Sequence, residues 1–200
     1  MHHDLNTVFW LLARSTGLVA WWLAALSVLW GLTMTGRAAR GRVTAAWLLD
    51  LHRQLSGTAV VFVALHVTAL ALDYTKPHIP LTAALIPMRA PWRPGPITVG
   101  VVALYLLLAV ELTSLVRDRL PRRVWHGIHL TSLAVFVLAT LHVLTTGTDR
   151  TNLAIQWSVL VQAAAFVFLA VYRLIDVVVG ITRPRRVPVR VPQRTPAAHD

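Results

Sequence analysis

The chain lacks cysteine and has few charged residues for its length. Of its 200 residues, 14% are charged and 56% are hydrophobic, and Lys76 is the one lysine among 19 basic residues. Without cysteine there can be no disulfide, thiolate metal site, iron–sulfur cluster or covalently attached c-type haem. Any bound metal must rely on nitrogen or oxygen ligands. So few polar residues cannot cover the surface of a soluble globule, which indicates a membrane protein.

The basic residues are spread between apolar segments and do not form one patch. Because the arginines behind the net charge of +11 separate long apolar runs, we expect a lipid bilayer and no nucleic acid as the partner. Five runs reach the roughly 20 residues needed to cross a hydrocarbon core. They span residues 8–33, 44–72, 97–116, 124–145 and 155–179. The sequence thus predicts an all-α, polytopic membrane helical bundle with about five transmembrane helices. The first run is too long for a signal peptide and is expected to remain as an anchor.

Arginine positions predict the orientation of the bundle, because short basic loops stay on the cytoplasmic side. Arginines concentrate in the loops after the first and third runs and in the tail: Arg37, Arg40, Arg42, Arg117, Arg119, Arg122, Arg123, Arg183, Arg185, Arg186, Arg190 and Arg194. We therefore expect the N-terminus outside and the C-terminus in the cytoplasm. The loop 73–96 opposes this with Lys76, Arg89 and Arg93, but it is longer and carries six prolines, and residues 81–86 are expected to form an interfacial turn. Residues 1–179 form the predicted membrane domain, and the basic Pro/Arg-rich segment 180–200 is expected to be a disordered cytoplasmic tail.

Four histidines lie inside two of the predicted helices, where ionisable side chains usually have a function. His52 and His66 are 14 residues apart in the second helix, and His129 and His142 are 13 residues apart in the fourth. These separations correspond to rises of about 21 Å and about 19.5 Å. Since the two helices run in the same direction, we expect His52 to pair with His129, and His66 with His142.

Two imidazoles at one depth suit the axial positions of a haem that transfers electrons, because filling both positions leaves no open site for oxygen or substrate. The sequence therefore predicts two stacked haem b groups, each with two axial histidines. One geometric feature opposes this: in a straight helix, His129 and His142 would point about 140° apart. The fourth helix must bend, unwind or swing its ligands, and Gly127 could permit such a distortion.

Other interpretations of these histidines remain open. Each one alone could be a buried polar group that joins two helices in a haem-free membrane protein, but four at matched depths favour ligands. His126, one turn before His129, could replace it, although it lies 16 residues from His142, a poorer depth match. A di-metal carboxylate site is disfavoured because the helices contain no Glu-x-x-His pair.

Two arginines are candidates for binding haem propionates. Arg14 lies inside the first helix, where an unpaired charge is costly unless it snorkels to the headgroups or meets an anion. A propionate of the outer haem is one such anion. Arg53 could do the same at the inner haem, although its position beside His52 turns it about 100° away.

The two histidine spacings and the segments around them resemble the ferric reductase-like transmembrane domain family, which includes the membrane parts of ferric reductases and NADPH oxidases. The similar segments are Arg14-Ser15-Thr16-Gly17, Leu51-His52-Arg53-Gln54-Leu55-Ser56, Leu65-His66-Val67, Trp125-His126-Gly127-Ile128-His129, Leu141-His142 and Thr146-Gly147-Thr148-Asp149. They look like those of the short bacterial members. The resemblance covers about residues 8–179, so residues 1–179 would be a ferric reductase-like haem-binding domain of a multi-pass plasma-membrane protein.

This resemblance implies a direction for electron transfer. In the family, an inner haem accepts electrons from a cytoplasmic flavin, and an outer haem passes them to an external acceptor. By analogy, His52 and His129 would hold the haem that receives electrons from a flavoprotein or from membrane quinol. His66 and His142 would hold the haem that reduces ferric iron, oxygen or a partner reductase. The family also includes the haem subunit of the bacterial methionine sulfoxide reductase system, which serves a molybdenum-cofactor partner.

The sequence departs from larger relatives in two respects. They carry a flavin and nicotinamide domain after the last helix, whereas no glycine-rich nucleotide fingerprint occurs here. We therefore expect the membrane subunit of an oxidoreductase, with flavin only in a separate partner. Many relatives have six helices, so a sixth is absent or supplied by a partner. The alternative is a non-redox role in haem sensing or haem transport, which requires at least one labile axial bond.

Overall fold

The computed structural model describes residues 2–34, 45–74 and 78–182. All regular structure in these ranges is helical, as predicted. The elements are α1 (His2–Met34), α2 (Ala45–Leu72), α3 (Leu81–Leu85), α4 (Pro94–Leu115), the 3-10 turn η2 (Arg117–Arg119), α5 (Arg122–Leu130), α6 (Ser132–Thr146) and α7 (Leu153–Thr182). The loop after α1, Lys76 and the tail from residue 183 lie outside the described residues.

The five predicted membrane spans are confirmed. In the described residues, five helical segments are long and apolar enough to cross a bilayer: Leu5–Met34, Ala46–Leu72, Pro94–Leu115, Arg122–Thr146 and Leu153–Val179. Many large apolar side chains on these segments are exposed, among them Leu112, Leu160 and Phe168. Exposed apolar side chains on long helices suit a surface that faces lipid tails.

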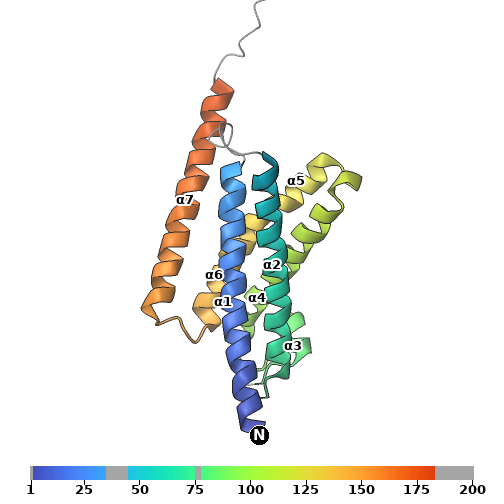
Figure 1. The fold of residues 1–200 in the computed structure, drawn as a ribbon, viewed down its shortest axis with the longest axis vertical. Helices are drawn as coiled ribbons and strands as arrows, with labels where there is room; N and C mark the ends of the chain where they lie inside the picture. The colour runs from blue at the N-terminus through green and yellow to red at the C-terminus, as the bar shows by residue number, and fades with distance from the viewer. Residues whose placement is uncertain (1, 35–44, 75–77, 183–200) are drawn as a thin grey trace, which may run out of the picture.

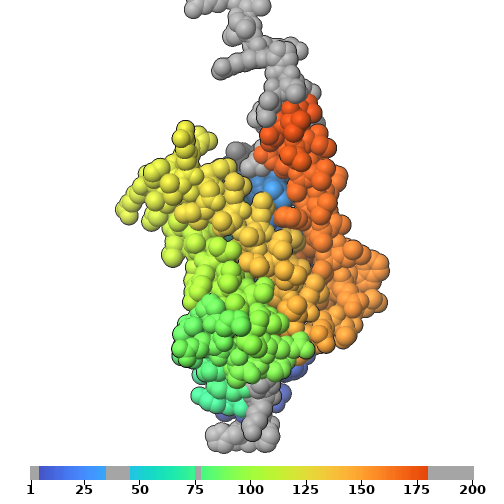
Figure 2. All heavy atoms as spheres, turned by 180° about the vertical axis from the view of Figure 1, so that it is seen from behind, coloured from blue at the N-terminus to red at the C-terminus, as the bar shows by residue number. Residues whose placement is uncertain are grey.

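The helices pack as a bundle in which α1 is central (Figure 1). It runs antiparallel to α2 along most of its length and also contacts α6 and α7, while α4 packs against α6. Figure 2 shows α7 along one side of the molecule and α5, with the end of α4, projecting on the other. The buried face of α1 is formed largely by small residues, including Ala13, Ala20, Ala24 and Ala25. Small residues allow helix backbones to approach closely in a membrane.

The proline-rich loop between α2 and α4 is folded against the bundle. The interfacial turn predicted at residues 81–86 is the short helix α3. Ile79, Ala83, Ala84 and Ala90 form a buried cluster here, against which Val67 of α2 packs. Two members of this cluster, Ile79 and Ala84, also line a cavity between the helices. The loop therefore helps to close the end of the bundle that carries His66.

The fourth span consists of two helices, because the helix is interrupted at Thr131. The Thr131 N–H donates to the Ile128 carbonyl at 3.0 Å, three residues back. Such a tight turn advances the chain by about 120° per residue, compared with about 100° in an α-helix. The interruption separates α5, which carries His129, from α6, which carries His142.

Candidate functional site

The four histidines of α2, α5 and α6 lie at two levels of the bundle. The rings of His52 and His129 are neighbours, with centroids 6.0 Å apart and planes inclined by 69°. Two imidazoles bound on opposite sides of one metal have ring centroids about 6 Å apart, given a metal–nitrogen bond of about 2.0 Å. His66 and His142 line one cavity between α1, α2, α4 and α6. The structure thus brings His52 to His129 and places His66 and His142 around a common space.

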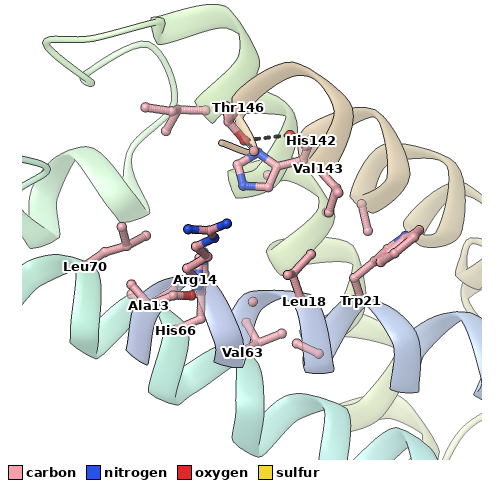
Figure 3. A pocket seen from close by; sticks show the side chains of 18 of the residues that line it. Ala13, Arg14, Leu18, Trp21, Val63, His66, Leu70, His142, Val143 and Thr146 are labelled. Atoms are coloured by element: carbon pink, nitrogen blue, oxygen red, sulfur yellow. Dashed lines mark hydrogen bonds between the residues drawn. The ribbon is translucent and has the colours of Figure 1, made fainter. Parts of the chain in front are cut away.

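The cavity beside His66 and His142 has a volume of about 500 Å³. This value lies within the roughly 300–1,000 Å³ typical of ligand and cofactor sites. Most of its lining is apolar, including Leu18, Leu104 and the buried indole of Trp21, whose Nε1 donates to the Thr140 hydroxyl at 3.1 Å. In Figure 3, His142 enters the cavity from α6, and Arg14 and His66 lie on the opposite side. The cavity could accept a flat apolar group between two imidazoles.

Three of the four histidines have their Nδ1 atom bonded to a backbone carbonyl of a neighbouring helix. His52 Nδ1 lies 3.1 Å from the Ser27 carbonyl, His66 Nδ1 lies 2.6 Å from that of Ala13, and His142 Nδ1 lies 3.0 Å from that of Pro96. A carbonyl oxygen only accepts hydrogen bonds, so Nδ1 must carry the proton and Nε2 keeps its lone pair. Bonds of this kind orient metal-bound histidines and raise the basicity of the ligand.

A glycine accompanies each of these three carbonyls, four residues further along the same helix. The pairs are Ala13 with Gly17, Ser27 with Gly31, and Pro96 with Gly100. A side chain at position i+4 covers the helix surface over the preceding turn, so only glycine leaves the carbonyl of residue i open to another helix. We call each carbonyl with its glycine a glycine socket.

The imidazole rings lie directly on these glycines. A Cβ atom on Gly17 would lie 2.7 Å from His66 Nδ1, and one on Gly100 would lie 2.6 Å from His142 Nδ1. At Gly31 the contact is looser, with 3.3 Å to Cε1 of His52. Each socket therefore both orients a histidine and provides the space for its ring.

His129 is the exception among the four. Its Nδ1 is buried and has no hydrogen-bond partner among the described residues. The ring is stacked instead on Trp125, with centroids 5.0 Å apart and planes inclined by 23°. The alternative ligand His126 is exposed on α5. Among the described ring contacts, His52 neighbours His129, whereas His126 neighbours Trp125.

The predicted arginines have carboxylate partners within the chain. Arg14 forms a two-pronged ion pair with Asp149, in the loop between α6 and α7, and its guanidinium also lies 4.9 Å from the ring centre of Trp10. Arg14 and Asp149 both line the cavity of His66 and His142. Arg53 is exposed and lies 3.8 Å from Asp50, one turn back on α2. Arg14 therefore stands at the cavity, whereas Arg53 stands on the surface beside His52.

Replacing Arg14 or Asp149, which form an ion pair, should lower the stability of the fold by different amounts. Asp149 has 12% of its side chain exposed and Arg14 has 37%. Arg14→Gln is expected to lower the free energy of unfolding by about 1.5–3 kcal/mol, because it leaves the more buried charge unpaired. Asp149→Asn should cost less, since an arginine can snorkel to the headgroups. Unfolding of both single variants and the double variant in detergent measures the coupling, and strictly additive effects would contradict the pairing.

The set of donor atoms limits what the site can hold. Across the described ranges, no three His, Cys, Asp or Glu side chains gather at one point. Two imidazoles are too few ligands for an isolated transition metal, so a metal held between them would need further ligands from a cofactor. A haem would supply four porphyrin nitrogens to its iron and would need two further ligands, which two imidazoles can provide. The histidine tautomers, the ring spacing and the apolar cavity fit this group.

The spacing of two glycines in the sequence also points to the site, in addition to the spacing of the histidines. Gly17 and Gly31 are 14 residues apart in α1, the same separation as His52 and His66 in α2. For two antiparallel helices, equal separations place each glycine opposite one histidine. Asp149 could not be assigned in this way, because a loop residue has no helical register.

The comparison with protein families matches residues 16–140 to the family described as "Ferric reductase like transmembrane component". The matched segment is more than half of the chain and contains His52, His66 and His129, and it ends two residues before His142. No curated protein and no solved structure matches the chain significantly. The family and the five spans together indicate a multi-pass membrane protein of electron transfer.

Proposed function

The chain belongs to the ferric reductase-like transmembrane family, and on this premise we propose that it holds two haem b groups and carries electrons across the membrane. His52 and His129 would be the axial ligands of one haem, and His66 and His142 those of the other. The haems would supply two one-electron carriers within the bilayer. Residues 1–179 would form this haem-binding domain.

The pairing of the histidines carries the proposal. One pair has rings 6.0 Å apart, and the other lines a cavity of about 500 Å³. In three of the four rings, the Nδ1–carbonyl bond leaves the Nε2 lone pair available for a metal. A histidine that only joins two helices would use both nitrogens for hydrogen bonds or place one in water. The arrangement therefore supports ligands better than structural hydrogen bonds.

The remaining residues of the chain would orient and insulate the carriers. The glycine sockets would orient three of the ligands, and the apolar lining with Trp21 would keep water away from the haem between His66 and His142. Arg14, held by Asp149 at the cavity, would meet the propionates of that haem, and Arg53 those of the other. Propionate binding by Arg14 would add a second anion to the same guanidinium, whose fork of donors can bond more than one carboxylate.

The arginine distribution supports an orientation with the His52–His129 pair near the cytoplasm. Arg53, Arg117, Arg119, Arg122 and Arg123 are exposed at that end of the described helices. A cytoplasmic flavoprotein or membrane quinol would donate electrons there. Ferric iron, oxygen or a partner reductase would accept them at the His66–His142 end. The membrane that we propose is the plasma membrane of a bacterial cell.

The proposal is tested by haem content and by electron transfer across vesicles. We expect the detergent-purified protein to hold two haem b per chain, with low-spin bands in oxidised and dithionite-reduced spectra. In vesicles loaded with ferricyanide, external dithionite should then reduce the internal ferricyanide faster than in protein-free vesicles. A purified chain without haem would refute the proposal. Rapid loss of both haems to apomyoglobin would favour the alternative role in haem transport.

A further inference from the structure

We propose that the His52–His129 site is also a binding site for a neutral diatomic gas, which replaces His129 on the ferrous haem. This inference rests on the proposed function, because it requires a haem between these residues. One ligand would be exchanged for another: His129 Nε2 would leave the iron, and the gas molecule would take its place. Iron is reduced beforehand by dithionite, and no electron is transferred in the exchange itself.

The first observation is that His129 lacks the support that the other three histidines have. Each of the other rings has a glycine socket, whereas the Nδ1 of His129 is buried with no partner in the described part of the chain. Removing the hydrogen-bond partner of a metal-bound histidine typically lowers metal affinity about 10–100-fold. The bond to His129 is therefore expected to be the weakest of the four axial bonds.

The second observation concerns the helix that carries His129. No residue of α5 is buried, and the helix is separated from α6 by the interruption at Thr131, two residues after His129. By contrast, α6 contains the buried residues Val135 and Phe136. Because few side chains of α5 are packed inside the protein, a displacement of this helix would disrupt little protein packing. A small rotation of α5 about Thr131 would withdraw His129 without disturbing α6.

The opposite ligand stays in place during such a movement. His52 is held by the Ser27 carbonyl and lies on Gly31 of α1, which is packed along α2. The haem would remain bound through His52 with one axial position open. The incoming ligand has to be small, because it takes the place of one imidazole, and a neutral molecule enters the membrane interior at far lower cost than an anion. Carbon monoxide, nitric oxide and oxygen meet both conditions.

Carbon monoxide titration of the dithionite-reduced protein tests the inference. We expect the wild type to bind one CO per two haems. The double variant His66→Ala/His142→Ala lacks both ligands of the other site, and its one remaining haem should still bind CO. In His129→Ala chains that retain this haem through His52, CO should bind at least about tenfold more tightly than in the wild type, because no histidine has to leave the iron before CO can bind.

His126→Ala is the matched control on the same helix and should bind CO as the wild type does. Tighter binding in this variant than in His129→Ala would overturn the assignment of the exchanged ligand. A wild type that holds two low-spin haems and binds no CO would overturn the inference and leave the proposed function intact. A wild type that holds no haem would refute both.

Discussion

Replacing either His66 or His142 by alanine is expected to halve the haem content, from two per chain to one. Each variant removes one axial ligand from the cavity of about 500 Å³. The remaining imidazole binds the iron from one side alone, so the affinity for this haem falls and it is lost during purification in detergent. The His52–His129 pair lies on other turns of α2 and on α5, so its haem should remain. Haem extracted per mole of chain, together with reduced-minus-oxidised spectra, measures this result.

Transfer of electrons to ferricyanide inside vesicles should fall to the rate of protein-free vesicles in both variants, because one of two carriers is missing. His78→Ala is the matched control. Its ring also has a carbonyl bond, with Nδ1 2.5 Å from the Asp73 carbonyl, but it stacks on the exposed Tyr74 outside the five spans. This control should keep both haems. Retention of both haems in His66→Ala and in His142→Ala would contradict the assigned ligands.

The helices and their number could be predicted because apolar run length is a strong signal in a membrane protein. Each predicted run agrees with an observed span to within a few residues, and the turn expected at 81–86 is α3. Membrane helices satisfy their own backbone hydrogen bonds, so few alternatives exist for a run of this length. The orientation of the bundle rests on loop arginines alone and stays a prediction.

The position of the break in the fourth span could not be predicted from the sequence. Thirteen residues do not return a side chain to one helix face, so the proposed ligand roles of His129 and His142 predicted a distortion somewhere in this span. Gly127 was a residue that could permit it, whereas the helix is interrupted at Thr131. Thr131 Oγ1 donates to the Ile128 carbonyl at 2.7 Å, together with its own N–H at 3.0 Å. Such local side-chain bonding competes with the regular helix, but whether a threonine does so depends on its neighbours.

The partner of Arg14 shows another limit of sequence reasoning. The depth of Arg14 in the first span predicted that it either snorkels to the headgroups or meets an anion, and a haem propionate was one such anion. The chain itself supplies Asp149, which is 135 residues away. Contacts of this kind depend on how α1 meets the loop between α6 and α7. Neither helix period nor hydrophobicity encodes that relation.

Glycine-to-alanine substitutions in the sockets are expected to remove haem while leaving the helices at least as stable. Alanine in a helix is favoured over glycine by about 1 kcal/mol, so a loss of haem could not be attributed to a weaker helix. In Gly100→Ala the new Cβ would lie 2.6 Å from the Nδ1 and Cε1 atoms of His142, and in Gly17→Ala it would lie 2.7 Å from Nδ1 of His66. The ring must move away and lose its carbonyl bond. Affinity for the haem of this pair should fall about 10–100-fold.

The contact distances predict a graded series that a general loss of stability would not reproduce. Gly31→Ala, with 3.3 Å to His52, should weaken the other haem by less, and Gly57→Ala on α2 meets nothing within 4 Å and should retain both. Haem content per chain, measured beside thermal unfolding of the haem-free protein, separates ligand displacement from misfolding. Equal haem content in Gly100→Ala, Gly17→Ala and Gly57→Ala would show that the sockets do not position the ligands. The packing of imidazole on glycine predicts a large loss of haem from Gly100→Ala and Gly17→Ala, a smaller loss from Gly31→Ala and none from Gly57→Ala, with unfolding temperatures unchanged or raised.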